Sequence, residues 1–141
     1  MRDTEYGMHR TLPGVAFDEA LERVTAALKE EGFGVLTRID VAQTLKTKIG
    51  VDFRPYVILG ACNPVLAHEA LSFDDNIGLM LPCNVVVAAA EGGTEVSCVR
   101  PHAMMAIADS PQIRDVADSA QAKLERAMRA IESDHSRVTE T

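Results

Sequence analysis

Several features common in proteins are scarce or missing in this chain. Tryptophan is absent and aromatic residues make up 4% of the sequence, so few rings can stack on bases or sugars, and small aliphatic side chains must fill the core. No apolar run reaches the roughly 18 residues of a membrane span, and the N-terminus lacks the apolar segment of a secretory signal. No Lys/Arg cluster offsets the formal net charge of −7. We therefore predict a cytoplasmic protein that binds neither nucleic acid nor a membrane.

The sequence signatures of common cofactor and catalytic sites are also missing. The chain contains no P-loop, no G-x-G-x-x-G, no G-x-S-x-G and no C-x-x-C. No cofactor is therefore predicted. Because no acid–base pair or nucleophile–base set can be read from the sequence, enzymatic activity stays undecided.

Length and composition predict one folded unit. A chain of 141 residues with 47% hydrophobic and 25% charged residues resembles an average globular domain. We expect a single domain over residues 1–141, with an ordered core at about residues 4–132 and a polar C-terminal tail at residues 133–141. The three cysteines, an odd number, fit a reducing compartment in which permanent disulfides are rare.

The hydrophobic periodicity predicts both strands and helices. Alternating or continuous apolar runs predict strands over residues 4–12, 33–39, 56–61, 85–90 and 94–99. Steps of three and four between apolar residues predict helices that begin at Phe17, Val41, Pro64 and Pro111, whereas residues 72–78 are predicted to form a polar turn. The fold class is therefore α+β, a two-layer sandwich with an antiparallel or mixed sheet of about five strands and helices on one face.

The last helix has the clearest apolar face. The predicted core positions on it are Ile113, Val116, Ala117, Ala120, Leu124, Ala127, Met128 and Ile131. Strands 56–61 and 85–90 are apolar on both faces, which is typical of interior strands and suggests that the far face of the sheet is covered as well. A second copy of the chain is the simplest cover, so we expect a homodimer.

Two Cys-Asn pairs form the candidate thiol site: Cys62-Asn63 and Cys83-Asn84. Cys62 directly precedes a predicted helix N-terminus, where the dipole and free N–H groups can lower the pKa of a thiol and favour the thiolate. If the two strands that bear them are neighbours, both thiols reach one edge of the sheet. The alternative is that the cysteines pack, as we expect of Cys98, while Asn63 caps the helix and Asn84 bonds to backbone.

A metal site is a weaker alternative. Cys62, Cys83 and His68, with Met104 or Met105, are ligand types that suit a soft metal. The competing interpretation, a surface histidine and core methionines, is favoured.

Several segments together resemble a known family. They are ILGACNP (58–64), LAHEAL (66–71), IGLMLPCNVVV (77–87), EEGFGVLTRIDVAQTLKTKIGVDFRPY (30–56) and RPHAMM (100–105). The chain is similar to the domain-of-unknown-function 302 family over roughly residues 6–131. The positions that match its pattern are Cys62, Asn63, Pro64, Leu81, Pro82, Cys83 and Asn84; Cys98 lies outside it.

The resemblance implies a fold but no activity. It implies the order β-α-β-β-β-β-α of TATA-binding-protein-like domains, with one or two extra helices, in small bacterial or archaeal proteins that are often homodimeric. Two functional hypotheses therefore remain. The first is a thiol-based redox, persulfide-carrier or soft-metal protein that uses Cys62 and Cys83. The second is a non-catalytic module for an apolar ligand, which is unknown, or for another protein, in which the cysteines only pack.

Overall fold

One antiparallel sheet of five strands, in the order β1-β5-β4-β3-β2, forms the centre of the molecule. The computed structural model describes the backbone of residues 1–140 and the side chains of residues 1–132, so the predicted polar tail lies outside the part with described side chains. The strands are β1 (Gly7–Pro13), β2 (Gly34–Asp40), β3 (Tyr56–Cys62), β4 (Cys83–Ala90) and β5 (Gly93–Val99). Strands β3 and β4 lie inside the sheet, which confirms the prediction that strands apolar on both faces are interior.

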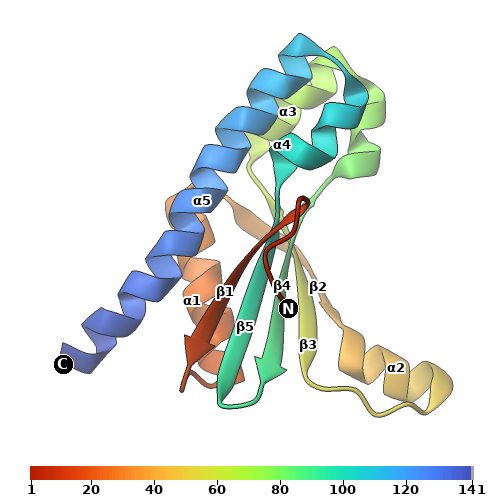
Figure 1. Ribbon diagram of the computed structural model, residues 1–141. Helices are drawn as coiled ribbons and strands as arrows, with labels where there is room; N and C mark the ends of the chain where they lie inside the picture. Colours follow the sequence, from red (N-terminus) through yellow and green to blue (C-terminus); the bar gives the residue numbers. More distant parts are fainter. Residues whose placement is uncertain (141) are drawn as a thin grey trace.

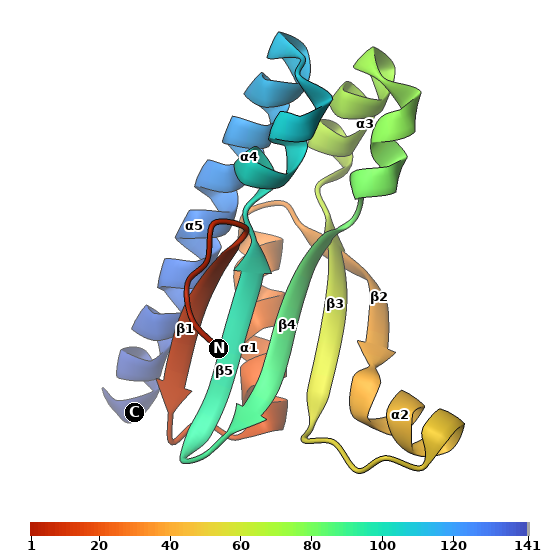
Figure 2. The same ribbon diagram turned by 45° about the vertical axis from the view of Figure 1, so that its right-hand side comes forward.

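The helices are divided between one face of the sheet and its two ends. They are α1 (Phe17–Glu30), α2 (Val41–Ile49), α3 (Pro64–Phe73), α4 (Pro101–Met104) and α5 (Pro111–Glu140), with 3-10 turns η1 (Asp75–Met80) and η2 (Met105–Ala108). Helices α1 and α5 cover one face, α3 and α4 stand beyond one end of the strands, and α2 projects from the other end beside β2 (Figures 1 and 2). The predicted α+β two-layer sandwich is confirmed.

The core lies between the sheet and the two covering helices. All eight predicted core positions of α5 are buried, and Leu124 is fully buried against α1 and the strands. The inward positions of the interior strands, such as Val57 and Val87, form the other wall. A smaller cluster, which includes Ile77 and Ile113, joins α3, η1 and η2 to α5. Aliphatic side chains therefore form one continuous core layer and a smaller extension of it.

Local signals account for most of the element boundaries. Asp40 caps α2 by accepting a 3.0 Å hydrogen bond from the Gln43 amide, and Gly50 ends that helix at φ 69°. The β4–β5 hairpin turns at Gly92, with φ 80°. The prediction of a polar turn at residues 72–78 is wrong, because α3 continues to Phe73 and η1 then follows. The two short helical segments within residues 101–108 were not predicted.

The face of the sheet that α1 and α5 do not cover, here called the far face, changes from apolar to polar across the strands. The register aligns Ile39, Ile58, Val86, Ser97 and His9 in one row across the five strands. The row is apolar over β2, β3 and β4 and polar over β5 and β1. The N-terminal segment runs along the polar part in Figure 2, so this face is already partly covered by the chain itself.

No helix within the described part of the chain is long and apolar enough to cross a membrane.

The burial of Leu124 yields a stability prediction. We expect Leu124→Ala to lower the free energy of unfolding by about 3 kcal/mol, because the substitution leaves a cavity between α5 and the sheet. Urea denaturation measures this difference. Leu79→Ala is the matched control, since Leu79 is 89% exposed and its truncation should change stability by no more than about 0.5 kcal/mol. Equal losses in the two variants would contradict this placement of α5.

Candidate functional site

The register of β3 and β4 determines where the two Cys-Asn pairs lie. The strands are antiparallel neighbours, and Ala61 pairs with Cys83. Cys62 is the next residue along β3 and ends that strand. Both cysteines therefore lie at the same end of the sheet, directly below α3, as the sequence predicted for neighbouring strands.

Asn63 links two helices at this end. Its Oδ1 accepts a 3.2 Å hydrogen bond from the Leu66 amide, which confirms the predicted cap of α3, and its Nδ2 donates to the Glu31 carbonyl at 3.4 Å. Gly32 adopts φ 84°, and a Cβ there would lie 2.9 Å from Asn63 Nδ2. Glycine therefore permits the close approach by which Asn63 holds the end of α1 to the start of α3.

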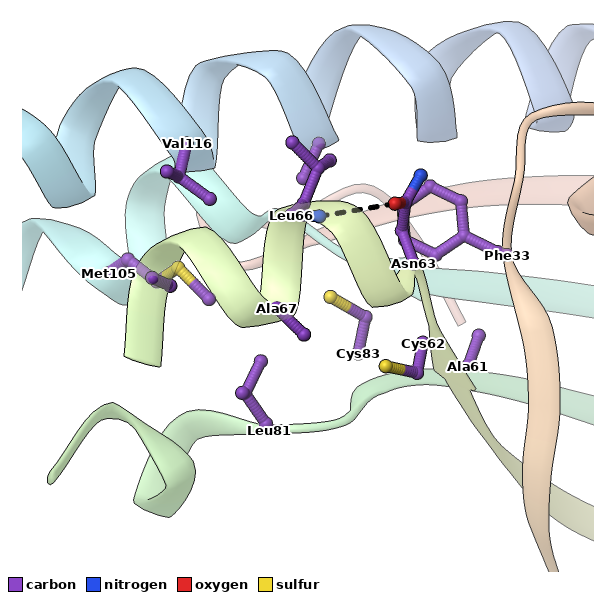
Figure 3. Close-up of a pocket in the computed structure, with 12 residues that line it drawn as sticks. Phe33, Ala61, Cys62, Asn63, Leu66, Ala67, Leu81, Cys83, Met105 and Val116 are labelled. Atoms are coloured by element: carbon purple, nitrogen blue, oxygen red, sulfur yellow. Dashed lines mark hydrogen bonds between the residues drawn. The ribbon is translucent and has the colours of Figure 1, made fainter. Parts of the chain in front are cut away.

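A small cavity of about 20 Å³ lies beside the two thiols. Cys62, Cys83 and Asn63 line it together with apolar side chains, among them Leu81 and Met105. In Figure 3 both sulfur atoms point toward the space between α3 and the segment that carries Leu81. A volume of this size holds about one water-sized group. It accommodates one added atom on a cysteine and excludes an organic ligand.

The two thiols differ in exposure. Cys83 is buried, whereas Cys62 is half-buried at the N-terminus of α3. Burial raises the pKa of the Cys83 thiol to about 11, and negative charge on Cys62 raises it further. Cys83 therefore stays neutral near pH 7. Cys98 packs in the core, as expected, and its burial raises the pKa of that thiol still more.

Two predicted members of the site lie elsewhere. Asn84 is exposed on the far face of the sheet, and within the described residues its side chain makes none of the predicted backbone hydrogen bonds. His68 is exposed on α3 and does not line the cavity. Among the side chains of residues 1–132, no three or more of His, Cys, Asp and Glu are grouped so as to hold a metal ion. The soft-metal set of Cys62, Cys83 and His68 is therefore not assembled.

The sequence analysis missed a polar network on the far face. His9 Nδ1 lies 3.3 Å from Ser97 Oγ, and His9 Nε2 lies 3.4 Å from Glu95 Oε1. Glu95 also accepts hydrogen bonds from the Met1 ammonium and from Arg54, each at 3.2 Å. These bonds outweigh the effect of burial and lower the pKa of Glu95. The pairing of β1 with β5 brings these side chains together. Their spacing along the sequence does not predict the contact.

The raised pKa of Cys83 predicts how stability depends on pH. An unfolded thiol ionises near pH 9, whereas the folded Cys83 keeps its proton to about pH 11. The stability that the fold gains from keeping Cys83 protonated is therefore fully present below pH 9 and is lost between pH 9 and 11. Over this range the contribution of Cys83 should lower the free energy of unfolding by about 2–3 kcal/mol. Urea denaturation at several pH values measures this loss.

Cys83→Ala provides the comparison for this prediction. It should be less stable by about 1 kcal/mol near neutral pH because of the atoms removed, yet show a smaller loss between pH 9 and 11 than the wild type. Identical slopes for the two proteins would mean that Cys83 ionises normally in the folded state.

Comparisons with known proteins agree with this architecture. The family described as "Domain of unknown function DUF302" matches residues 8–131. The structure is similar to the crystal structure of an uncharacterized conserved DUF302 protein from Bacillus stearothermophilus, with a TM-score of 0.82 and 29% sequence identity over 91% of this chain and 99% of that chain. No curated protein matches the sequence. Because the family match spans most of the chain, including the strands and helices around both Cys-Asn pairs, this protein belongs to the DUF302 family.

Proposed function

We propose that this protein is a thiol carrier of the reducing cytoplasm, in which Cys62 holds a single added atom, a sulfane sulfur or an oxygen. The observation that carries the proposal is the cavity of about 20 Å³ that both Cys62 and Cys83 line. One sulfur or oxygen atom fits such a volume. The surrounding apolar side chains would shield the added atom from water and from bulky reductants.

Cys62 is the better nucleophile of the two. It is half-buried and directly precedes Asn63, the N-cap of the ten-residue α3, so a small reagent can reach it more easily than the buried Cys83. Cys83 is buried and neutral, so it acts as the second thiol. The two sulfur atoms are then held on neighbouring strands beside one cavity.

The proposed chemistry balances without a cofactor. The Cys62 thiolate attacks the outer sulfur of a low-molecular-weight persulfide, the donor S–S bond breaks, and the donor leaves as a thiolate. With hydrogen peroxide, the Cys62 thiolate bonds to one oxygen, the O–O bond breaks, and the leaving hydroxide takes a proton from solvent to give water. Attack by Cys83 on the resulting sulfenic acid would form a disulfide and release a second water.

Mass spectrometry of the loaded protein tests the proposal. Treatment with an equimolar inorganic polysulfide or hydrogen peroxide should add one sulfur or one oxygen at Cys62, and Cys62→Ser should add neither. The matched control is Cys98→Ala, which alters a cysteine outside the cavity and should load as the wild type does. Slow and equal modification of all three cysteines would contradict the proposal, because Cys62 would then be no more reactive than the other two.

Soft-metal binding has less support within the same thiol hypothesis. Its third predicted ligand, His68, is exposed and does not line the cavity. A metal would also have to displace the proton that burial retains on Cys83.

An interaction module is the second candidate, and exposed apolar side chains favour it. Leu79, Ile107, Val65, Tyr6 and Leu36 are each at least 68% exposed, and where exposed apolar side chains lie together they form protein contact surfaces. We include the expected homodimer in this proposal. Its apolar-ligand form is less well supported, because the cavity at the thiols is too small for an organic molecule.

Replacement of both site cysteines separates the two candidates. Cys62→Ser with Cys83→Ala should abolish atom loading and leave the sedimentation coefficient of the dimer unchanged. If the double variant is monomeric, the thiols serve the assembly; if it still loads an atom, the reactive group lies elsewhere.

A further inference from the structure

We infer that the cavity beside Cys62 and Cys83 selects sulfur over oxygen, so that the atom which Cys62 carries is a sulfane sulfur delivered by an inorganic polysulfide or a small persulfide. This selectivity rests on the proposed loading of Cys62 and names the substrate class of that same site. It depends on which groups around the cavity can donate a hydrogen bond. An oxygen bound to a cysteine needs such donors, whereas a second sulfur does not.

The walls of the cavity are apolar. Nine of the twelve described residues that line it have apolar side chains, and the other three are Cys62, Cys83 and Asn63. Figure 3 shows Ala67 of α3 and Leu81 on two sides of the space toward which the sulfur atoms point. An oxygen placed in this space would therefore face carbon atoms on most sides.

Asn63 is the one amide among the described side chains that line the cavity, and its polar atoms are already engaged. Its Oδ1 accepts the hydrogen bond from the Leu66 amide at 3.2 Å, and its Nδ2 donates to the Glu31 carbonyl at 3.4 Å. In Figure 3 the nitrogen lies on the side of Asn63 that is away from both sulfur atoms. Asn63 therefore orders the start of α3 and does not direct a donor at an atom bound to Cys62.

The start of α3 has few backbone amides left for an oxygen anion. Pro64 carries no N–H, and the Leu66 N–H is bonded to the side chain of Asn63. The Ala67 N–H donates to the Asn63 carbonyl at 2.9 Å. Val65 is 75% exposed and does not line the cavity. A helix N-terminus binds anions through its free amides, and here the proline and the cap remove most of them.

The second thiol suits a sulfur atom better than an oxygen atom. Cys83 is buried and keeps its proton near pH 7, because burial raises the pKa of this thiol to about 11. An S–H group is a weak donor, so it replaces little of the hydration that a sulfenic acid loses on burial. Sulfur is a weak acceptor and is polarisable. An added sulfur therefore gains from contact with Cys83 and with the apolar walls.

The shortage of donors affects the two loading reactions differently. In the sulfur reaction the Cys62 thiolate bonds to one sulfur of the donor, the donor S–S bond breaks, and its electron pair leaves on a sulfur atom, where the charge is diffuse. With hydrogen peroxide the electron pair of the O–O bond leaves on hydroxide, a small anion that hydrogen-bond donors must stabilise as it forms. Loss of one such donor slows enzyme reactions roughly a hundredfold or more. The cavity should therefore slow the oxygen reaction alone.

The ratio of two rate constants tests this selectivity in the wild-type protein. Loading of Cys62 by sodium disulfide without oxygen, and separately by hydrogen peroxide, is followed by mass spectrometry with peptide mapping, and both rate constants are also measured for free cysteine. The thiolate fraction cancels in each ratio, because one thiolate carries out both reactions. The sulfur-to-oxygen ratio of Cys62 should exceed that of free cysteine at least about tenfold. A ratio no higher than that of free cysteine would overturn the inference.

A donor placed in the cavity wall should weaken the preference for sulfur. Leu81→Asn replaces an apolar lining side chain by an amide of similar size with two N–H donors. It should raise the rate constant for peroxide at least about fivefold and change the rate constant for disulfide less than about twofold. Leu79→Asn is the matched control, since Leu79 is 89% exposed and does not line the cavity. It should leave both rate constants unchanged.

Ala67→Ser provides a second variant if circular dichroism shows that Leu81→Asn disturbs the fold. It adds one hydroxyl to the α3 side of the cavity and should shift the ratio in the same direction by a smaller factor. Folded variants that keep the wild-type ratio would show that donors do not control loading, and the selectivity would be refuted.

Two outcomes separate this selectivity from the thiol proposal. If neither reagent loads an atom at Cys62, the thiol proposal and the selectivity are refuted together. If both reagents load Cys62 with the ratio of free cysteine, the selectivity alone is refuted, and Cys62 remains a carrier of either atom.

Discussion

The pairing of β3 with β4 is the constraint on which the rest of the structure depends. Because Ala61 pairs with Cys83, the twenty-one intervening residues must leave the sheet and return to the same end. They do so as α3 and η1, which stand on the strand ends and pack on α5 through Ile77 and Ile113. This excursion closes the cavity above the strands, and both Cys-Asn pairs lie where it begins and ends.

Burial then gives two chemically equal residues different properties. Cys83 is held within the sheet, where desolvation keeps its thiol neutral, whereas Cys62 is half-buried at the end of β3, directly before the Asn63 cap of α3. The same cap joins α3 to the end of α1 and depends on glycine at position 32. The proposed thiol chemistry thus follows from backbone placement: Cys62 precedes a helix, as its neighbours Asn63 and Pro64 predict, whereas Cys83 begins an interior strand.

The layer arrangement also explains which apolar surfaces are left over. Helices α1 and α5 cover a single face of the sheet, and the N-terminal segment occupies the polar part of the other. No strand within residues 1–140 pairs with the outer edge of β2, and α2 contains no fully buried residue. A helix with good caps at Asp40 and Gly50 can therefore form correctly and still leave its side chains half-buried or exposed.

Local sequence was sufficient for most of the elements. Caps at Asp40, Asn63 and Ser110, the Gly92 turn and the three-and-four periodicity of α5 each depend on neighbours a few residues away, so the sequence alone determined them. The register of the sheet, the burial of Cys83 against the exposure of His68, and the contact of His9 with Glu95 join residues far apart along the chain. Only the tertiary structure could decide these, because desolvation and long-range pairing depend on what surrounds a side chain rather than on what precedes it.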